Sequence, residues 1–478
     1  MYSLDDTIAA ISTAPGEGGI GIVRMTGPDS AEILHQMFVP AIRHQVGGNG
    51  DQEPILQPRT LRYGHIADPG TGEKIDEVLA VHMPAPHTYT RQDVVEIQGH
   101  GGFVAMQRIQ ALCLQRGARL AEPGEFTARA FLNGRLDLAQ AEAVLDVVQA
   151  RTEVALQAAV GQLGGLLSDQ VRSARGALLG VLAYLEASID FVEDEIPEQD
   201  IGPIMAEASA CLQRLIAEAD RGIIYRQGVR AAIVGRPNVG KSSLLNRLLR
   251  TSRAIVTDIP GTTRDTLEET LNLQGIPIVL VDTAGIMAGT DNPIERLGIE
   301  RSRAALSQAN LALWVVDASR PLTDADLDIA ALVGSRPVIA VLNKIDLLES
   351  SQYHDIVAKG LERSTQLHGA DTDGFIVSVS ARTGEGLDRL EAAIVEAILS
   401  GRASAGQPPL VTSPRHRQAL NQALDHVNAA REGYGTGQLA DMLAIDLTAA
   451  VTALGEITGQ TASDDLLETI FASFCIGK

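Results

Sequence analysis

Several residue types are scarce in this sequence of 478 residues, and each scarcity narrows the class of protein. Aromatic residues make up 3% of the chain, with Trp314 as the single tryptophan, so Ala, Leu, Ile and Val must fill the cores. This mixture favours helices and parallel sheets over sandwiches. The three cysteines, Cys113, Cys211 and Cys475, form no CxxC pair. They therefore indicate neither a disulfide framework nor a zinc site, and they fit a reducing cytoplasm.

Long apolar runs and positive charge are also missing. No stretch of about 18 apolar residues predicts a membrane-spanning helix. The acidic N-terminus has neither the basic start nor the apolar stretch of a signal peptide. The formal net charge is -21. Because neutralising phosphates needs clustered Lys and Arg, a nucleic-acid partner must meet a local basic patch or come through another protein.

The pattern along the chain predicts a multidomain protein, as its length also does. Residues 1–135 mix short β-type runs, turns and a helical stretch, which is typical of an α+β domain. Apolar residues recur at helical spacing in residues 136–228 and 401–478, which predicts a mainly α-helical domain in two parts. Between them, residues 229–400 alternate strands and helices, as in an α/β domain with a doubly wound parallel sheet. Gln274 and Gly275 predict a turn between two antiparallel strands of that domain.

The strongest motif of the sequence is GRPNVGKS at residues 235–242. It fits the P-loop pattern, follows a predicted strand and opens a predicted helix. Its glycines let backbone N–H groups approach phosphates, and the helix N-terminus favours their negative charge. Lys241 would reach the β and γ oxygens, and Ser242 can ligate Mg²⁺. A chance Gly-rich turn is improbable here because further nucleotide motifs follow in the right order.

Two later segments predict that the base is guanine. The sequence NKID ends a strand at Asp346, whose carboxylate can accept hydrogen bonds from the guanine N1–H and exocyclic amine. Adenine offers no such donor pair, so this carboxylate would discriminate against ATP. The sequence SAR at residues 380–382 would present a backbone amide to the guanine oxygen. These motifs together predict a GTPase.

Two segments between the P-loop and NKID would surround the γ-phosphate. The sequence GTTRD at residues 261–265 predicts a mobile loop in which Thr263 is the second Mg²⁺ ligand. The sequence DTAG at residues 282–285 ends a strand, where its carboxylate can hold the Mg²⁺ shell and the Gly285 amide can meet the phosphate. The residues predicted to contact the nucleotide are Asn238, Val239, Gly240, Lys241, Ser242, Ser243, Thr257, Asp258, Ile259, Pro260, Gly261, Thr262, Thr263, Asp282, Thr283, Ala284, Gly285, Asn343, Lys344, Asp346, Ser380, Ala381 and Arg382.

The group that orients the attacking water is less clear from the residues alone. Ile286 follows DTAG, where a GTPase of the Ras type has a glutamine. Hydrolysis therefore needs another group, and Glu295 at the start of the next helical segment is the candidate. Taken by itself, Glu295 fits an exposed helix-cap carboxylate better.

The chain resembles a known family over nearly its whole length. The order GRPNVGKSS, GTTRD, DTAG, ERLGIERS, NKID and SAR resembles the Era-like branch of the translation-factor-related GTPases. Four further segments resemble the MnmE (TrmE) family of tRNA modification GTPases. They are APGEGGIGIVRMTG at 14–27, YTRQDVVEIQGHGG at 89–102, EPGEFTARAFLNGRLDLAQAEA at 122–143 and FCIGK at 474–478. Gln92 stands where the family pattern carries Glu.

This resemblance implies an activity and a second site. The family acts with the flavoprotein MnmG (GidA) to install a carboxymethylaminomethyl or aminomethyl group at C5 of the tRNA wobble uridine. The one-carbon donor is 5,10-methylenetetrahydrofolate, with 5-formyltetrahydrofolate as an analogue. The N-terminal domain would be folate-binding-like and form a homodimer, and the GTPase domain would be inserted in the helical domain. The folate contacts fall on Arg24, Glu96, Arg135 and Lys478, and Cys475 is either a one-carbon site or a free thiol.

The resemblance also implies a K⁺ site and a catalytic set. K⁺ would be held by Asn238 with loop carbonyls of Thr257, Ile259 and Thr262, in place of an arginine finger. Glu295 would orient the hydrolytic water, with Lys241 and Thr263 completing the catalytic residues. The protein would be cytoplasmic and would hold tRNA largely through MnmG. The alternative is a regulatory GTPase switch in ribosome assembly or stress response, which predicts no folate binding.

Overall fold

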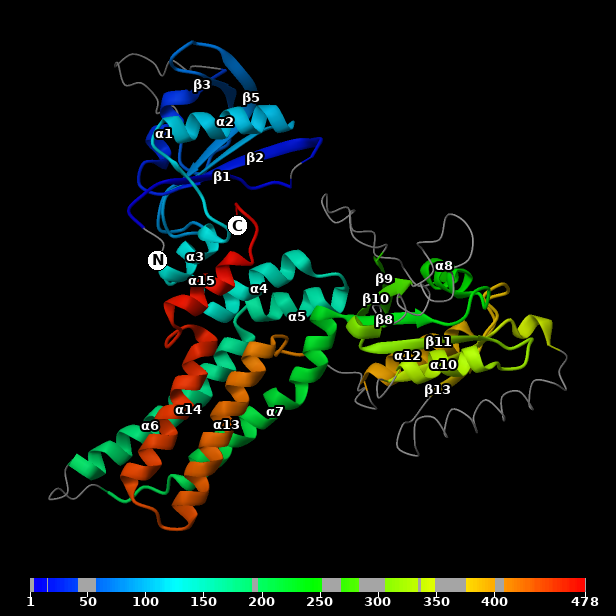
Figure 1. Ribbon diagram of the computed structural model, residues 1–478. Coiled ribbons are helices and arrows are strands. Elements are labelled where there is room, and N and C mark those ends of the chain that lie inside the picture. Colours follow the sequence, from blue (N-terminus) through cyan, green and yellow to red (C-terminus); the bar gives the residue numbers. More distant parts are fainter. Residues whose placement is uncertain are drawn as a thin grey trace, which may run out of the picture. The chain divides into compact units, whose positions relative to one another are not determined.

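The computed structural model describes residues 4–14, 16–41, 57–190, 197–251, 268–282, 306–333, 337–348, 375–399 and 408–477 (Figure 1). The chain divides into two compact units. The first contains residues 1–148, 160–213 and 418–478, and the second contains residues 149–159 and 214–417. The second unit thus interrupts the first along the sequence. The domain boundaries predicted after residues 135, 228 and 400 do not coincide with these limits, and they stay predictions.

The first unit begins with a seven-stranded sheet in the order β3-β4-β5-β6-β2-β1-β7. Its paired strands are antiparallel except β1 and β7, which are parallel. Two helices, α1 (Ser30–Met37) and α2 (Phe103–Gln115), pack against it. The strands are β1 (Ile8–Ile11), β2 (Gly18–Thr26), β3 (Phe38–Pro40), β4 (Arg62–Ala67), β5 (Lys74–Met83), β6 (Val94–Gly101) and β7 (Arg119–Leu120).

The alternation of side chains along β2 and β6 separates the two faces of this sheet. Val23 and Ile97 belong to the core that also contains residues of α1 and α2. Because successive residues of a strand point to opposite faces, Arg24 and Glu96 lie on the other face. That face is covered by a smaller apolar cluster, which includes Phe126.

The remainder of the first unit is helical, and α6 and α14 run side by side through it (Figure 1). Their buried residues recur at alternating intervals of four and three, as two packed helices require. In α6 these residues are Leu167, Val171, Ala174, Leu178, Val181 and Leu185, and in α14 they are Leu443, Leu447, Ala450, Leu454 and Ile457. The helices after α2 are α3 (Glu125–Leu132), α4 (Leu138–Gln149), α5 (Glu153–Leu163), α6 (Leu166–Asp190), α7 (Gly202–Gln227), α13 (Pro414–Gly435), α14 (Ala440–Thr458) and α15 (Asp464–Ala472).

The second unit contains a six-stranded sheet in the order β13-β12-β11-β8-β10-β9. All its pairs are parallel except β9 with β10, which are joined by the predicted turn. Gln274 and Gly275 form this turn at φ 51° and 91°, a left-handed conformation that hairpins favour. The strands are β8 (Val229–Val234), β9 (Glu268–Leu273), β10 (Ile276–Asp282), β11 (Leu311–Asp317), β12 (Val338–Asn343) and β13 (Phe375–Ser378).

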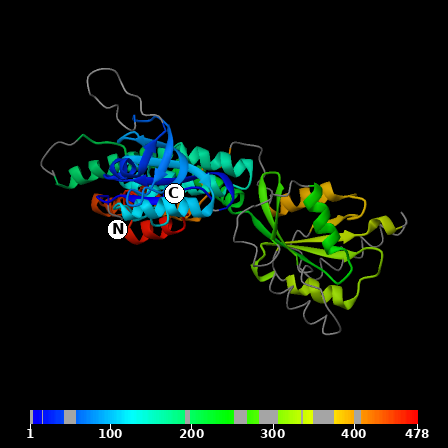
Figure 2. The same cartoon turned by 90° about the horizontal axis from the view of Figure 1, so that it is seen from above.

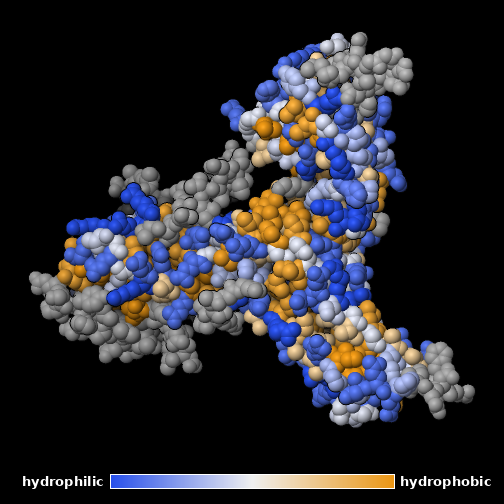
Figure 3. Space-filling model, turned by 180° about the vertical axis from the view of Figure 1, so that it is seen from behind, coloured by the Kyte–Doolittle hydropathy of each residue, from blue (hydrophilic) through white to orange (hydrophobic). Residues whose placement is uncertain are grey.

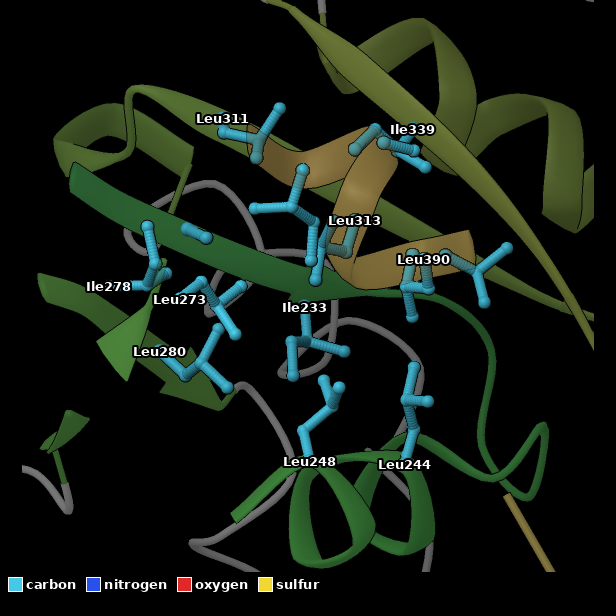
Figure 4. Packing of buried hydrophobic residues seen from close by; sticks show 14 of the residues in the cluster. Ile233, Leu244, Leu248, Leu273, Ile278, Leu280, Leu311, Leu313, Ile339 and Leu390 are labelled. Atoms are coloured by element: carbon cyan, nitrogen blue, oxygen red, sulfur yellow. The ribbon is translucent and has the colours of Figure 1, made fainter. Parts of the chain in front are cut away.

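Helices cover both faces of this sheet (Figure 2), so its central strands read as continuous apolar runs. Every residue of β11 is buried. Leu311 and Leu313 point into the core that contains Leu244 of α8 and Leu390 of α12 (Figure 4), whereas Trp314 points into the core of the other face. The helical elements are α8 (Lys241–Thr251), α10 (Asp324–Val333), η1 (Ile345–Leu347) and α12 (Leu387–Leu399).

The surface of the chain is mixed in character. On the face seen in Figure 3, hydrophobic patches stand among hydrophilic side chains. None of the helices that the structure describes is long and apolar enough to cross a membrane.

A buried ion network ties the N-terminal segment to α3 in the first unit. The Arg129 side chain is fully buried and donates to the carboxylates of Asp6 and Glu125 and to the Asp6 carbonyl oxygen. Arg119 donates to the same two carboxylates. Burial raises the pKa of Asp6, but hydrogen bonds from Arg119 and Arg129 outweigh it and the net shift is downward. The network therefore stabilises the unit above the ordinary pKa of Asp6 and weakens as pH falls through the lowered value.

We expect Arg129→Met to destabilise the first unit by about 1.5–3 kcal/mol, because it removes one of the two cationic partners of the buried Glu125 carboxylate and leaves Arg119 as the other. Urea unfolding followed by circular dichroism measures this loss. Trp314 lies in the second unit, so the fluorescence transition should stay in place. Arg172→Met is the matched control, since that side chain pairs at an exposed site and should cost at most about 1 kcal/mol. Equal losses for both variants would contradict the assignment.

Candidate functional site

The P-loop connects β8 to α8 and is packed tightly against neighbouring strands. Gly235 and Gly240 have φ values of 155° and 99°. A Cβ on Gly235 would lie 2.3 Å from the Val315 carbonyl oxygen, and one on Gly240 would lie 2.2 Å from Asn343 Nδ2. Both positions therefore require glycine for lack of space as well as for backbone conformation.

The Lys241 ammonium and the N-terminus of α8 give the loop a positively polarised surface. Lys241 Nζ donates to the carbonyl oxygens of Gly235 and Arg236, each at 2.8 Å, which holds the ammonium against the curve of the loop. Ser242 and Ser243 are exposed in the first turn of α8. Backbone N–H groups at such a helix N-terminus favour an anion, so this surface can hold a phosphate chain.

Asn343, at the end of β12, joins the P-loop to the segment after β13. Its Nδ2 donates to the Val239 carbonyl oxygen at 2.9 Å, and its Oδ1 accepts from the Ala381 N–H at 3.0 Å. The side chain is buried, so both hydrogen bonds are shielded from water. The phosphate-binding loop and the segment at residues 380–382 are thus held in a fixed relation.

The carboxylate of Asp346 lies beside that segment. Its Oδ1 accepts from Ser380 Oγ at 2.7 Å, and its Oδ2 lies 3.5 Å from Nε of the exposed Arg382. The Asp346 side chain is only 12% exposed. A carboxylate fixed in this way can accept from the two adjacent donors of guanine, whereas adenine would leave it unpaired.

Lys344 connects the base side of the site with the phosphate side. It has a left-handed backbone, and its Nζ donates to the Asn238 carbonyl oxygen at 2.7 Å and to Asp317 Oδ2 at 2.6 Å. Asn238 also has a positive φ, 65°, and its side chain is exposed. The P-loop is therefore braced from both Asn343 and Lys344.

Two acidic residues near the site were missed by the sequence reasoning. Asp317 ends β11, at the same edge of the sheet where the strands that carry the other motifs end. Its position at the end of a predicted strand could therefore have indicated that it lies near the site. Asp326 is fully buried and accepts from Nε of the P-loop residue Arg236 at 2.6 Å. It also accepts from the Thr323 N–H and hydroxyl, an arrangement that the spacing of a capping box could have suggested.

Of the remaining predicted nucleotide contacts, Asp282 alone lies within the described residues. Asp282 ends β10 and pairs with Ile233 of β8, which puts its backbone at the edge where the P-loop begins. The proposed catalytic Glu295 lies outside the described residues. So do Thr257, Asp258, Ile259, Pro260, Gly261, Thr262, Thr263, Thr283, Ala284 and Gly285.

The first unit brings three predicted folate contacts to one region. Arg24 and Glu96 face each other on β2 and β6, and the Glu96 carboxylate accepts from Arg24 Nε at 2.9 Å and Nη2 at 2.8 Å. The Arg24 guanidinium lies 5.9 Å from the centre of the Phe126 ring, and that of Arg135 lies 4.7 Å from the Tyr89 ring. Burial raises the pKa of Tyr89, whose hydroxyl is 2.9 Å from that of Thr127.

The C-terminal segment contacts the two residues of the first unit that come directly before α3. The Gly124 N–H donates to the Cys475 carbonyl oxygen at 3.3 Å, and Ile476 forms a bridge with Pro123. The Cys475 side chain is exposed. Lys478, the fourth predicted folate contact, lies outside the described residues.

The P-loop, the anchored Asp346 and the parallel sheet define a P-loop domain that binds guanine nucleotides. Comparisons with known proteins agree with this class. A family model described as GTP-binding protein TrmE N-terminus matches residues 7–135, and one described as MnmE helical domain matches residues 138–475. The chain therefore belongs to the MnmE (TrmE) family of tRNA modification GTPases, and it is a GTP hydrolase in tRNA modification.

Individual relatives match over their full length. The tRNA modification GTPase MnmE of Roseiflexus sp. (strain RS-1) is 51% identical over 474 residues, covering 99% of each chain. That of Chloroflexus aurantiacus is 49% identical over 476 residues, covering 99% of this chain and 100% of its own. Among solved structures, the G domain of the T. maritima FeoB iron transporter is 28% identical, covering 35% of this chain and 98% of its own. Its TM-score of 0.25 is too low to bear on this fold.

We expect Asn343→Ala to weaken GDP binding at least about tenfold, because the Val239 oxygen and the Ala381 N–H each lose a buried partner worth about 1–3 kcal/mol. Titration with a fluorescent GDP analogue measures the affinity. Asn310→Ala is the control. Asn310 comes directly before β11, at the opposite end of the strands from the nucleotide site. Its side chain accepts from the Arg230 N–H of β8, and its loss should leave GDP affinity unchanged. Unaltered binding by Asn343→Ala would refute the bridging role.

Proposed function

We propose that this GTP hydrolase acts with MnmG in the cytoplasm to modify C5 of the tRNA wobble uridine. The group installed is carboxymethylaminomethyl or aminomethyl, with 5,10-methylenetetrahydrofolate as the one-carbon donor. The observation that carries this proposal is the region around Arg24 and Glu96, which lies in a different unit from the nucleotide site. A GTPase acting only as a switch has no need of such a region.

The residues of this region fit the chemistry of a folate. A carboxylate such as Glu96 can accept from the N–H groups of a pteridine, and the partly buried ring of Tyr89 offers an apolar face. The guanidinium group of Arg135 can pair with a carboxylate of the glutamate tail, whereas Arg24 is already paired with Glu96 and would orient that carboxylate toward the pteridine. Lys478 would add a third cation, and Cys475 lies three residues before it in the sequence. A role for Cys475 as one-carbon site belongs to this proposal.

Two described residues of the nucleotide site, Ser242 and Asn238, offer groups for the two proposed metal ions. Ser242 in the first turn of α8 supplies a hydroxyl for Mg²⁺, and Thr263 would supply the second. The Asn238 carbonyl oxygen already accepts from Lys344, so its exposed side-chain amide is the group that would ligate K⁺. The remaining K⁺ ligands would be the carbonyls of Thr257, Ile259 and Thr262. A cation there supplies charge neutralisation as the phosphate bond breaks, while Glu295 would orient the water.

The proposed partners are those that the family resemblance implies, and the charge of the chain is consistent with them. A net charge of -21 makes it difficult for this chain to hold tRNA by itself. We therefore assign most of the basic surface to MnmG. The chain itself would act as a homodimer through its N-terminal domain, so that two GTPase domains can meet and exclude water from the hydrolytic site.

We expect Arg24→Ala to weaken binding of 5-formyltetrahydrofolate about tenfold, because it removes the cation that orients the Glu96 carboxylate. Isothermal titration calorimetry measures the affinity. Arg108→Ala is the matched control, since Arg108 lies on α2, the helix on the opposite face of the sheet, and pairs with Glu73 at an exposed site. Absence of binding by the unaltered protein would favour the regulatory switch.

We expect GTP hydrolysis to be faster in KCl than in NaCl, because K⁺ would neutralise charge as the phosphate bond breaks.

We also expect Glu295→Ala to lower kcat about 100-fold while GDP affinity changes little, because Glu295 would act on the water and not on the nucleotide. Steady-state phosphate release in each salt measures both effects. Glu396→Ala, on the exposed side of α12, is the control. Equal rates in the two salts, or full activity of Glu295→Ala, would end this part of the proposal.

A further inference from the structure

Asp317 holds a carboxylate at the nucleotide edge of the second sheet, although it belongs to none of the nucleotide motifs. The residue is 5% exposed. Its Oδ1 accepts from the Ser319 N–H at 3.0 Å and from Ser319 Oγ at 2.6 Å. Its Oδ2 accepts from Lys344 Nζ at 2.6 Å. Three donors thus fix the carboxylate in one orientation.

The partner of this carboxylate reaches the P-loop. Lys344 Nζ also donates to the Asn238 carbonyl oxygen, and its backbone lies between Asn343 and Ile345 in the base-reading segment. A lysine side chain loses conformational entropy when it is fixed in one rotamer. The Lys344 ammonium donates both to the neutral Asn238 carbonyl oxygen and to the charged Asp317 carboxylate, and the bond between two opposite charges is the stronger of the two. The ion pair with Asp317 is therefore the main interaction that fixes the Lys344 side chain.

We propose that Asp317 is a positioning residue for guanine-nucleotide binding. It holds Lys344 in the place where that side chain braces the P-loop at Asn238 and sets the segment that reads the base. Asp317 acts through Lys344 and does not touch the nucleotide. Burial raises the pKa of Asp317, but hydrogen bonds from Lys344 and Ser319 outweigh it, so that the net shift is downward. The ion pair therefore persists at neutral pH and is lost only in acid.

The first test is Asp317→Asn, which keeps the shape and removes the charge that holds Lys344. We expect GDP to dissociate about tenfold faster, the effect of losing one charged hydrogen bond. The KM for GTP should rise more than kcat falls. Stopped-flow release of a fluorescent GDP analogue measures the rate, and Asp324→Asn, an exposed residue at the start of α10, is the control with the same change of charge. An unchanged dissociation rate would overturn the proposal, even if the thermal stability of the nucleotide-free protein fell.

The second test asks whether Asp317 acts through Lys344. In a Lys344→Met background, Asp317→Asn should add little to the dissociation rate, because the side chain that it positions is absent. A full additional tenfold increase in the double variant would show an independent effect and overturn the proposal. Should Asp317→Asn fail to fold, Ser319→Ala removes one of the donors that orient the carboxylate. It should raise the dissociation rate about threefold, and no change would again count against the proposal.

Discussion

The nucleotide site depends on one buried side chain, Asn343, which holds two separate loops together. Its amide group accepts from the segment after β13 and donates to the P-loop, so it satisfies two backbone groups that water cannot reach. This arrangement is possible because β8, β12 and β13 are parallel. Parallel strands bring the loops that follow them to one edge of the sheet, where residues distant in sequence can be tied by a short side chain.

The sheet can hold these loops because it is covered on both faces. Every residue of β11 is buried, with Leu313 and Trp314 pointing into opposite cores. A strand packed in this way has little freedom to shift, since interiors are close-packed and a displacement would open voids on both sides. The P-loop is also held close to this strand at Gly235, because the Val315 carbonyl of β11 leaves no room for a side chain there. The precision of the site is therefore a property of the core beneath it.

The sequence predicted much of this arrangement, for reasons that differ between elements. The alternation of apolar runs and helical patterns predicted the parallel sheet, and the NKID motif placed Asn343 and Asp346 at the end of a strand. Asp317 and Asp326 were missed because an acidic residue after a strand or in a helix start is common, and only distances reveal their partners. The region around Arg24 came from family resemblance, since an isolated arginine on a strand carries no signal. The aromatic rings of Tyr89 and Phe126 could be assigned to this region only from the folded structure.

Gln92 illustrates how charge balance limits such inferences. The family resemblance leads us to expect Glu at this position, whereas the Gln92 side chain donates to the Leu4 carbonyl oxygen while accepting from Arg129. Arg129 and Arg119 are already matched by the carboxylates of Asp6 and Glu125, so a third carboxylate would add unbalanced negative charge beside a buried network. It would also lose the donor to the Leu4 oxygen. The amide satisfies both neighbours without charge, which makes this residue part of the structural support of the domain and removes the need for a charge at position 92.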